Sequence, residues 1–300
     1  YVEKPCSHNG QEGEWMVKAA ESFGKCVQMG TQRRSAPGTR EAIAKLHDGA
    51  IGNIHLARCY YTSLRGSIGE GTQTEPPAEL DYELWQRPVP RTPYRSNVAH
   101  YNWHWFWHWG GGELANNGVH GLDLCRWGLQ VDYPTQAISS GGRYWFKDDQ
   151  ETPDLQAVAF EFEGNKQITW DGTSCHKHSV DYFCAFFGDQ GTLALDENGK
   201  YRIFDRHDKL VEEGGEPAGG QVEHLQNFID CIRNGTPEGL NQPILEGHKS
   251  TLLCHLGNIA YRTGQTVFVD PMTGRIRDND LQQQLWGRDY DKAWVAAVSM

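Results

Sequence analysis

The spacing of apolar residues over the first 50 positions predicts helices that alternate with short strands. Apolar side chains recur at helical intervals between Ser7 and Gly24, and Gly24 stands where a left-handed glycine commonly ends a helix. The apolar run 25–30 predicts a short strand, and a second helix is expected over about 39–48. With Val2 at the end of a further strand, this alternation is typical of a wound α/β unit.

After residue 50 the pattern changes to that of half-buried strands. Alternating apolar and polar positions predict a strand over 54–63, and the Gly- and Pro-rich stretch 68–94 predicts a long loop. A helix is expected at 118–129. Turn residues then separate runs that predict strands at 136–146, 155–162, 166–174, 180–187, 191–196 and 200–204. Further helices are expected at 221–234, 243–263 and 277–294. The regular strand spacing favours an antiparallel sheet, and hence an α+β domain.

Composition excludes several classes of partner. The chain has 300 residues, of which 38% are hydrophobic, so a sizeable core can form. Its mean hydropathy is -0.65, and it contains no apolar run long enough for a membrane-spanning helix. The 28 Lys and Arg against 39 Asp and Glu give a formal net charge of -11. We therefore expect neither nucleic acid nor a membrane among its partners.

The cysteines indicate a compartment rather than a site. Eight are spread along the chain without a C-x-x-C pair, a pattern that predicts buried thiols in a reducing environment. We therefore expect a cytoplasmic protein. The periplasm is the alternative, because the sequence starts at Tyr1 without an initiator Met, as a processed chain or a fragment of a longer one would.

The segment Glu3-Lys4-Pro5 is the first candidate for chemistry, since it follows a short strand. Strand ends in open α/β sheets face the ligand crevice. A lysine there can lose solvation, which moves its pKa toward neutrality and lets it relay a proton or bind a substrate hydroxyl. The alternative is an ordinary surface lysine.

The second candidate is the glycine-rich stretch 110–112 with the helix that follows it. His120 and Asp123 would lie one turn apart on that helix, and Asn116 precedes His120 by four residues. A neutral imidazole can take a proton from a carbinol oxygen, and the carboxylate can orient the ring or bind another hydroxyl. The alternative is a capping Asn and a core His.

The aromatic run 100–109 contains four tryptophans and could line a groove for a polyol ring; core packing is the alternative. Trp107 in this run and Trp85 in the long loop are the expected stacking residues. His104 and His108 are spaced like helical metal ligands, but no third ligand matches them, so we expect no metal site.

A polar and basic segment, 28–34, follows the second short strand, and there the Arg33 guanidinium could bind hydroxyls or a carboxylate. A solvated interdomain arginine pair is the alternative. The sequence contains neither G-x-G-x-x-G nor a P-loop. Taken alone, that absence argues against a dinucleotide enzyme.

Together these segments resemble the Gfo/Idh/MocA family, the group of glucose–fructose oxidoreductase, inositol 2-dehydrogenase and rhizopine-catabolism proteins. The resemblance covers essentially the whole chain. It is carried by Val2-Glu3-Lys4-Pro5, Val27-Gln28-Met29-Gly30-Thr31-Gln32-Arg33, Asp81-Tyr82-Glu83-Leu84-Trp85, Gly110-Gly111-Gly112, His120-x-x-Asp123, His224-Leu225-Gln226-Asn227-Phe228 and Gly257-Asn258-Ile259-Ala260-Tyr261-Arg262-Thr263-Gly264.

The resemblance implies a Rossmann domain followed by an α/β domain with an open, mostly antiparallel sheet. Because the glycine-rich loop is missing, we expect residues 1–34 to be the C-terminal remnant of the NAD(P)-binding domain. Residues 35–300 would form the substrate and oligomerisation domain. The resemblance further implies NAD or NADP as cofactor, a small sugar or polyol as substrate, and a homo-oligomer (dimer or tetramer) formed through the antiparallel sheet.

The resemblance also implies roles for single residues. Lys4 would be the active-site lysine and His120 the acid/base. Asn116 stands where many members have Asp, so Lys4 and His120 would carry more of the work here. The expected substrate contacts are Arg33, Asn116, Asp123, Trp85 and Trp107, and the expected cofactor contacts are Glu3, Lys4, Pro5 and Gln32.

The implied reaction is hydride transfer between nicotinamide and a secondary alcohol of a sugar, cyclitol or glycoside. Two alternatives stay open. One is an NAD-dependent glycosidase that works by transient oxidation and elimination. The other is a non-catalytic fragment that contacts carbohydrate or mediates oligomerisation.

Overall fold

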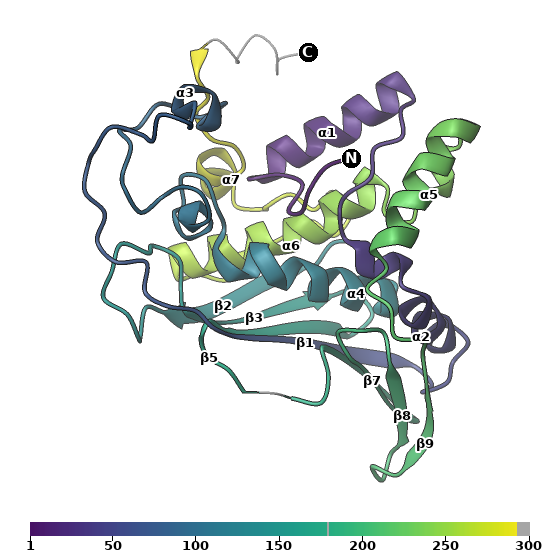
Figure 1. Cartoon of the computed structure of the whole chain (residues 1–300). Helices are drawn as coiled ribbons and strands as arrows, with labels where there is room; N and C mark the ends of the chain where they lie inside the picture. The colour runs from purple at the N-terminus through teal and green to yellow at the C-terminus, as the bar shows by residue number, and fades with distance from the viewer. Residues whose placement is uncertain (179, 293–300) are drawn as a thin grey trace.

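A large mixed sheet forms one layer of the structure, and helices cover one of its faces (Figure 1). The computed structural model describes residues 1–178 and 180–292. The strands lie in the order β10-β2-β3-β4-β1-β6-β7-β8-β9, and β5 pairs with β1. Their bounds are β1 Ile54–Leu64, β2 Gln136–Gly142, β3 Leu155–Phe162, β4 Lys166–Thr173, β5 Cys175–His176, β6 Cys184–Gly188, β7 Gly191–Leu195, β8 Tyr201–Asp205, β9 Leu210–Gly214 and β10 Val267–Phe268.

The sheet is antiparallel except where β1 runs parallel to β4, with Cys59 opposite Trp170. The predicted open, mostly antiparallel sheet is therefore confirmed. The β2 strand ends at Gly142 rather than at 146 as predicted. The backbone N–H groups of Tyr144 and Trp145 donate to the Asp154 carboxylate, at 2.9 and 3.1 Å, so this side chain replaces a strand partner.

The long helices follow the predicted order, and only the last one differs from its predicted bounds by more than a few residues. The α-helices are α1 Gly10–Phe23, α2 Pro37–His47, α3 Tyr82–Trp85, α4 Val119–Leu129, α5 Gln221–Asn234, α6 Ile244–Thr263 and α7 Asn279–Leu285. The 3₁₀ turns are η1 Gln32–Ser35, η2 Asn102–Trp105 and η4 Pro237–Gly239, and η3 Leu114–Gly118 is a π-helical turn.

Capping residues explain where the first helix begins and ends. The Asn9 side chain accepts a hydrogen bond from the Glu12 backbone N–H, so α1 begins at Gly10 and not at residue 7 as predicted. Gly24 ends it with φ 56°, the predicted left-handed glycine. The helix predicted over 277–294 is shorter and spans only α7, and residues 293 and 294 lie outside the described part.

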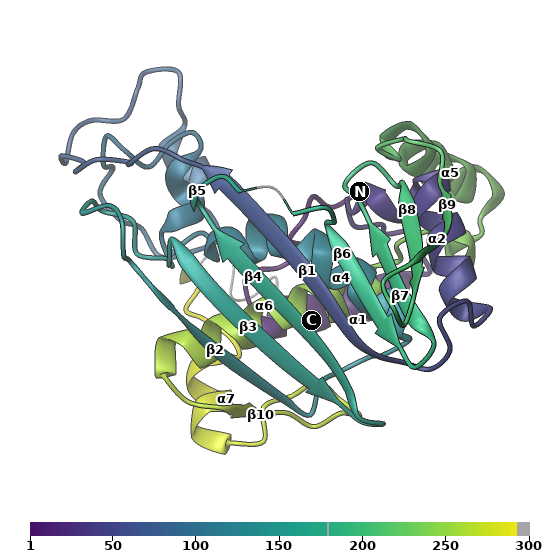
Figure 2. The ribbon, with the colours of Figure 1, turned by 90° about the horizontal axis from the view of Figure 1, so that it is seen from below.

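The core lies between the sheet and helices α4 and α6, and Figure 2 looks onto the opposite face of the sheet. Phe160 and Trp170 project into this core from β3 and β4. Met29 belongs to the same cluster, so the first 34 residues pack directly against the remainder. Val2 and Met29 form a parallel bridge, as expected for the end of an α/β unit. The boundary at residue 34 stays a prediction.

All eight cysteines lie within the described residues, where none is in a disulfide and all but Cys26 are buried. This agrees with the predicted role of the thiols as small core residues. Among the described residues, no helix is long and apolar enough to cross a membrane.

Candidate active site

A cleft of about 1360 Å³ opens beside the segment Glu3-Lys4-Pro5. Its walls come from parts of the chain that are distant in sequence, because α1 and α6 bring both ends of the chain against the aromatic run. The lining segments are 3–9, the start of α1, 103–104, 107–112, 115–116, the end of α6 and 282–289. The predicted cofactor contacts Glu3, Lys4 and Pro5 therefore lie at one ligand-sized cavity.

Lys4 is held by Asn116, which belongs to the π-helical turn η3. The ammonium donates to the Asn116 backbone carbonyl at 2.6 Å and to the side-chain Oδ1 at 2.7 Å. Burial lowers the pKa of Lys4 from its ordinary value. Within the described residues, two of its three N–H donors are thus occupied, which leaves one for a ligand in the cleft. This is not the environment of an ordinary surface lysine.

A buried carboxylate that the sequence analysis did not single out lies directly behind Asn116. Glu113 is 4% exposed and accepts from Arg65 through both oxygens, at 2.6 and 3.1 Å. Its Oε1 also accepts from the side-chain amides of Asn116, at 3.3 Å, and Asn117. Its place one helical turn before Asn116 was the available signal.

His120 lies in the first turn of α4 and is 9% exposed. Its Nδ1 is buried and has no partner among the described residues. Burial, followed by the positive charges of Lys4 and Arg33, lowers the pKa of His120 to about 3. The imidazole is therefore neutral near pH 7, and it is a weaker base than a free histidine. His120 is not among the residues that line the cleft.

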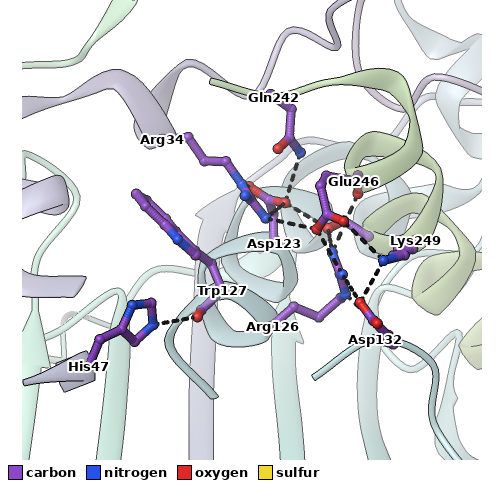
Figure 3. Close-up of polar contacts among 10 residues, drawn as sticks. Arg34, His47, Asp123, Arg126, Trp127, Asp132, Gln242, Glu246 and Lys249 are labelled. Carbon is purple, nitrogen blue, oxygen red and sulfur yellow. Dashed lines mark hydrogen bonds and ion pairs between the residues drawn. The ribbon is translucent and has the colours of Figure 1, made fainter. Parts of the chain in front are cut away.

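The structure does not support a substrate contact for Asp123. This carboxylate is 1% exposed and receives two hydrogen bonds from Arg34, at 2.8 and 3.0 Å (Figure 3). Gln242 and Ser250 donate to its Oδ1 at 2.8 and 2.6 Å. Four internal donors satisfy the charge, as in a structural ion pair, and turn the side chain toward Arg34 instead of the cleft.

Arg33 and Gln32 also lie apart from the cleft, on the 3₁₀ turn η1. The Arg33 guanidinium stacks 4.2 Å from the ring centre of Phe183 and donates to the Glu197 carbonyl. Its charge still reaches His120, whose pKa it lowers. The structure therefore brings Arg33 near the histidine but does not bring Gln32 to the predicted cofactor side.

The two predicted stacking residues line two adjoining cavities. Trp107 lines the main cleft, and the Arg262 guanidinium lies 5.2 Å from its ring centre. Trp85 lines a neighbouring cavity of about 330 Å³ and packs against Trp109, with ring centres 5.3 Å apart. Trp109 lines both cavities, so the aromatic run forms the wall between them.

His104 and His108 of the aromatic run do not lie on one regular helix. The η2 turn ends at Trp105, between them. His104 Nδ1 pairs with the Tyr101 carbonyl at 2.6 Å, and His108 Nε2 pairs with the Pro90 carbonyl at 3.1 Å. Each ring is thus oriented by a backbone carbonyl, and His104 stacks on Trp103 with ring centres 3.7 Å apart.

Comparison with solved structures shows a shared fold. A putative oxidoreductase from Thermotoga maritima matches with TM-score 0.65 and 14% identity, over 89% of this chain and 71% of that one. Aldose-aldose oxidoreductase from Caulobacter crescentus, complexed with glycerol, matches with TM-score 0.63 and 17% identity over the same shares. The WlbA dehydrogenase from Bordetella pertussis, in complex with NADH and UDP-GlcNAcA, matches with TM-score 0.61 and 16% identity, over 89% of this chain and 70% of that one.

A search of curated proteins finds no match. A family model does match, however, and it covers residues 66–296, most of the chain. Its description is the C-terminal alpha/beta domain of an oxidoreductase family. This match agrees with the mixed sheet and its helical cover. The chain therefore belongs to the Gfo/Idh/MocA family of oxidoreductases.

Proposed function

We propose that this chain contributes the substrate side of an NAD(P)-dependent oxidoreductase that acts on a secondary alcohol of a sugar, cyclitol or glycoside. The observation that carries the proposal is the partly desolvated Lys4 ammonium at the cleft, with one N–H donor left for a ligand. Family membership supports the reaction class. The neighbours complexed with NADH and a nucleotide sugar, or with glycerol, support the cofactor and the substrate class.

The residues of the cleft fit the nicotinamide end of such a cofactor. Three buried ring nitrogens among the lining residues have no hydrogen-bond partner in the described part of the chain: His8 Nδ1, Trp109 Nε1 and Trp286 Nε1. Buried polar atoms of this kind favour a polar ligand. Glu3, Lys4 and Pro5 would hold the ring from one side. When bound, nicotinamide supplies the hydride acceptor or donor.

Lys4 and His120 would divide the proton chemistry between them. Oxidation of a carbinol removes a hydride, with its electron pair, from carbon and a proton from oxygen. The free N–H of Lys4 would donate to that oxygen and orient it. His120 is neutral at pH 7 but does not line the cleft, so it would receive a proton only indirectly, from the Lys4 amino group as that group takes the proton of the carbinol. As the hydride leaves, the O–H group becomes far more acidic than an alcohol, so an imidazole of low pKa can still accept through Lys4.

A substrate screen tests the reaction class. The natural gene product that contains this chain is incubated with NAD or NADP and a panel of sugars, inositols and glycosides, and NAD(P)H absorbance is followed. We expect net reduction of the cofactor with at least one polyol. Glycoside cleavage without net NADH would instead favour the glycosidase. Failure to retain either dinucleotide at millimolar concentration would favour a non-catalytic role.

We also propose that the chain forms a homo-oligomer through the face of the sheet that the helices leave open (Figure 2). The strand register aligns Ile138, Ala159 and Thr169 in one row across β2, β3 and β4. Ile138 is 43% exposed on that face. Small and apolar side chains in a row allow a second sheet to approach closely.

A further inference from the structure

Glu113 is a buried carboxylate that accepts hydrogen bonds from Arg65, Asn116 and Asn117. It is 4% exposed, while Arg65 is 23% exposed at its side chain. Arg65 also stacks over the Trp105 ring, 4.9 Å from its centre, which fixes the guanidinium plane. The fork geometry of the pair fixes the carboxylate in turn. Glu113 is therefore a fixed negative charge behind the π-helical turn.

The Asn116 amide lies between this carboxylate and the Lys4 ammonium. Its Oδ1 is 2.7 Å from Lys4 Nζ, and its Nδ2 is 3.3 Å from Glu113 Oε1. An ammonium can only donate hydrogen bonds, and an ionised carboxylate can only accept them. Only one orientation of the amide therefore satisfies both neighbours. If Glu113 lost its charge, its side chain could donate as well as accept, and the orientation of the Asn116 amide would no longer be fixed.

We propose that Glu113 is a positioning residue, which acts through Asn116 to hold the Lys4 ammonium at the cleft and to keep it charged. The consequence for catalysis rests on the proposed function, whereas the placement of Lys4 by Asn116 and Glu113 does not. The Asn116 amide itself carries no charge. Glu113 thus supplies the buried negative charge that a lysine with only neutral acceptors would lack.

Among the charged groups around Lys4, Glu113 is the buried anion with the strongest effect on the pKa of Lys4. Burial lowers the pKa of Lys4, and Glu113 acts in the opposite direction more strongly than the other groups do. The remaining titratable or charged groups that interact with Lys4 are Glu3, Arg65, Cys254, His104 and His120. Burial raises the pKa of the Cys254 thiol and lowers the pKa of both histidines, so these three are neutral near pH 7. Glu3 is exposed to solvent.

The test is the pH dependence of Lys4 acetylation by acetic anhydride, followed by peptide mass spectrometry. Only the free amine reacts, so the rate at neutral pH reports how firmly Lys4 holds its proton. Glu113→Gln should raise that rate roughly threefold to tenfold and move the whole titration curve to lower pH. An unchanged curve in a folded Glu113→Gln protein would overturn the proposal.

Three further variants separate positioning from simple loss of structure. Asn116→Ala keeps the Arg65–Glu113 pair and removes only the link, so Lys4 labelling should again become faster. Glu113→Asp keeps the charge and should restore part of the wild-type curve. Glu83→Gln breaks another Arg–Glu ion pair, with Arg91, whose residues do not line the cleft, and should leave Lys4 labelling unchanged.

Two results would count against the proposal even if Glu113→Gln failed to fold. The first is wild-type labelling of Lys4 in Asn116→Ala. The second is an effect of Glu83→Gln as large as that of Asn116→Ala, which would indicate a general loss of structure. Labelling requires neither cofactor nor substrate, so these results are independent of the oxidoreductase screen.

Discussion

At the scale of single residues, the buried charges in and near the site are compensated by different kinds of hydrogen-bond partner. The Lys4 ammonium donates to the Asn116 amide, which in turn donates to the Glu113 carboxylate. The Asp123 carboxylate accepts from four donors. Local sequence pattern predicted Lys4, Asn116 and His120 as site residues, and the structure places Lys4 and Asn116 at the cleft. The pattern could not assign Asp123, because its partners Arg34, Gln242 and Ser250 lie 89, 119 and 127 residues away in sequence. Only the fold brings them together.

Replacement of Asp123 by Ala should destabilise the protein strongly. It would leave the Arg34 guanidinium buried, at 7% side-chain exposure, without its principal counter-charge. The expected loss is about 3–5 kcal/mol in the free energy of unfolding, measured by urea denaturation. The exposed pair of Glu83 and Arg91 offers a control, since Glu83→Gln should cost less than about 1 kcal/mol. Equal effects of the two variants would contradict a structural role for Asp123.

At the scale of elements, helices with strong caps and periodicity were predictable, whereas very short strands were not. The α5 helix was predicted with its observed bounds. The five-residue strand β9 was missed. The two-residue strands β5 and β10 were missed as well, because so short a run carries no periodicity. The π-helical turn η3 was missed as well, since the predicted helix began only at residue 118. It places Asn116 against Lys4, and widened turns of this kind are frequent at functional sites.

The approach of α4 to the sheet depends on a glycine. A Cβ added at Gly121 would lie 2.6 Å from the Cβ of Cys59 on β1. Gly121→Ala should therefore push α4, which carries His120, away from β1. We expect about 1–3 kcal/mol of destabilisation, measured as a lower Tm and urea midpoint.

Gly66 is the matched control for this substitution. A Cβ added there meets nothing within 4 Å. Gly66→Ala should leave stability within about 0.5 kcal/mol of the wild type. If Gly121→Ala were as harmless as Gly66→Ala, the close contact between α4 and β1 would not be a constraint on the site.

At the scale of the whole molecule, helices cover one face of the sheet and leave the other face open. The helical side holds the cleft, where segments from the beginning, middle and end of the chain meet. The other side is an open sheet face. The fold class and the order of the long elements were predictable from the sequence. The cleft was not, because it depends on the packing of α1, α6 and residues 282–289.

A charge placed on the open sheet face should disrupt the proposed oligomer. Ala159→Glu introduces a carboxylate at the centre of β3, between Ile138 and Thr169. We expect the mass measured by light scattering to fall to that of one chain. Val222→Glu adds the same charge on α5, at a position 75% exposed, and should leave the mass unchanged. An oligomer that survives Ala159→Glu but not Val222→Glu would place the interface on α5 instead.

The most direct test of the central claim is the effect of His120→Ala on kcat/KM for hydride transfer, with a polyol identified by the screen. If His120 is the acid/base group that we propose, its loss should lower kcat/KM by about 10²–10⁴-fold, while dinucleotide binding is retained. His207→Ala, in the exposed turn between β8 and β9, is the control and should match the wild type. Undiminished kcat/KM in a folded His120→Ala protein would contradict the proposed role of His120.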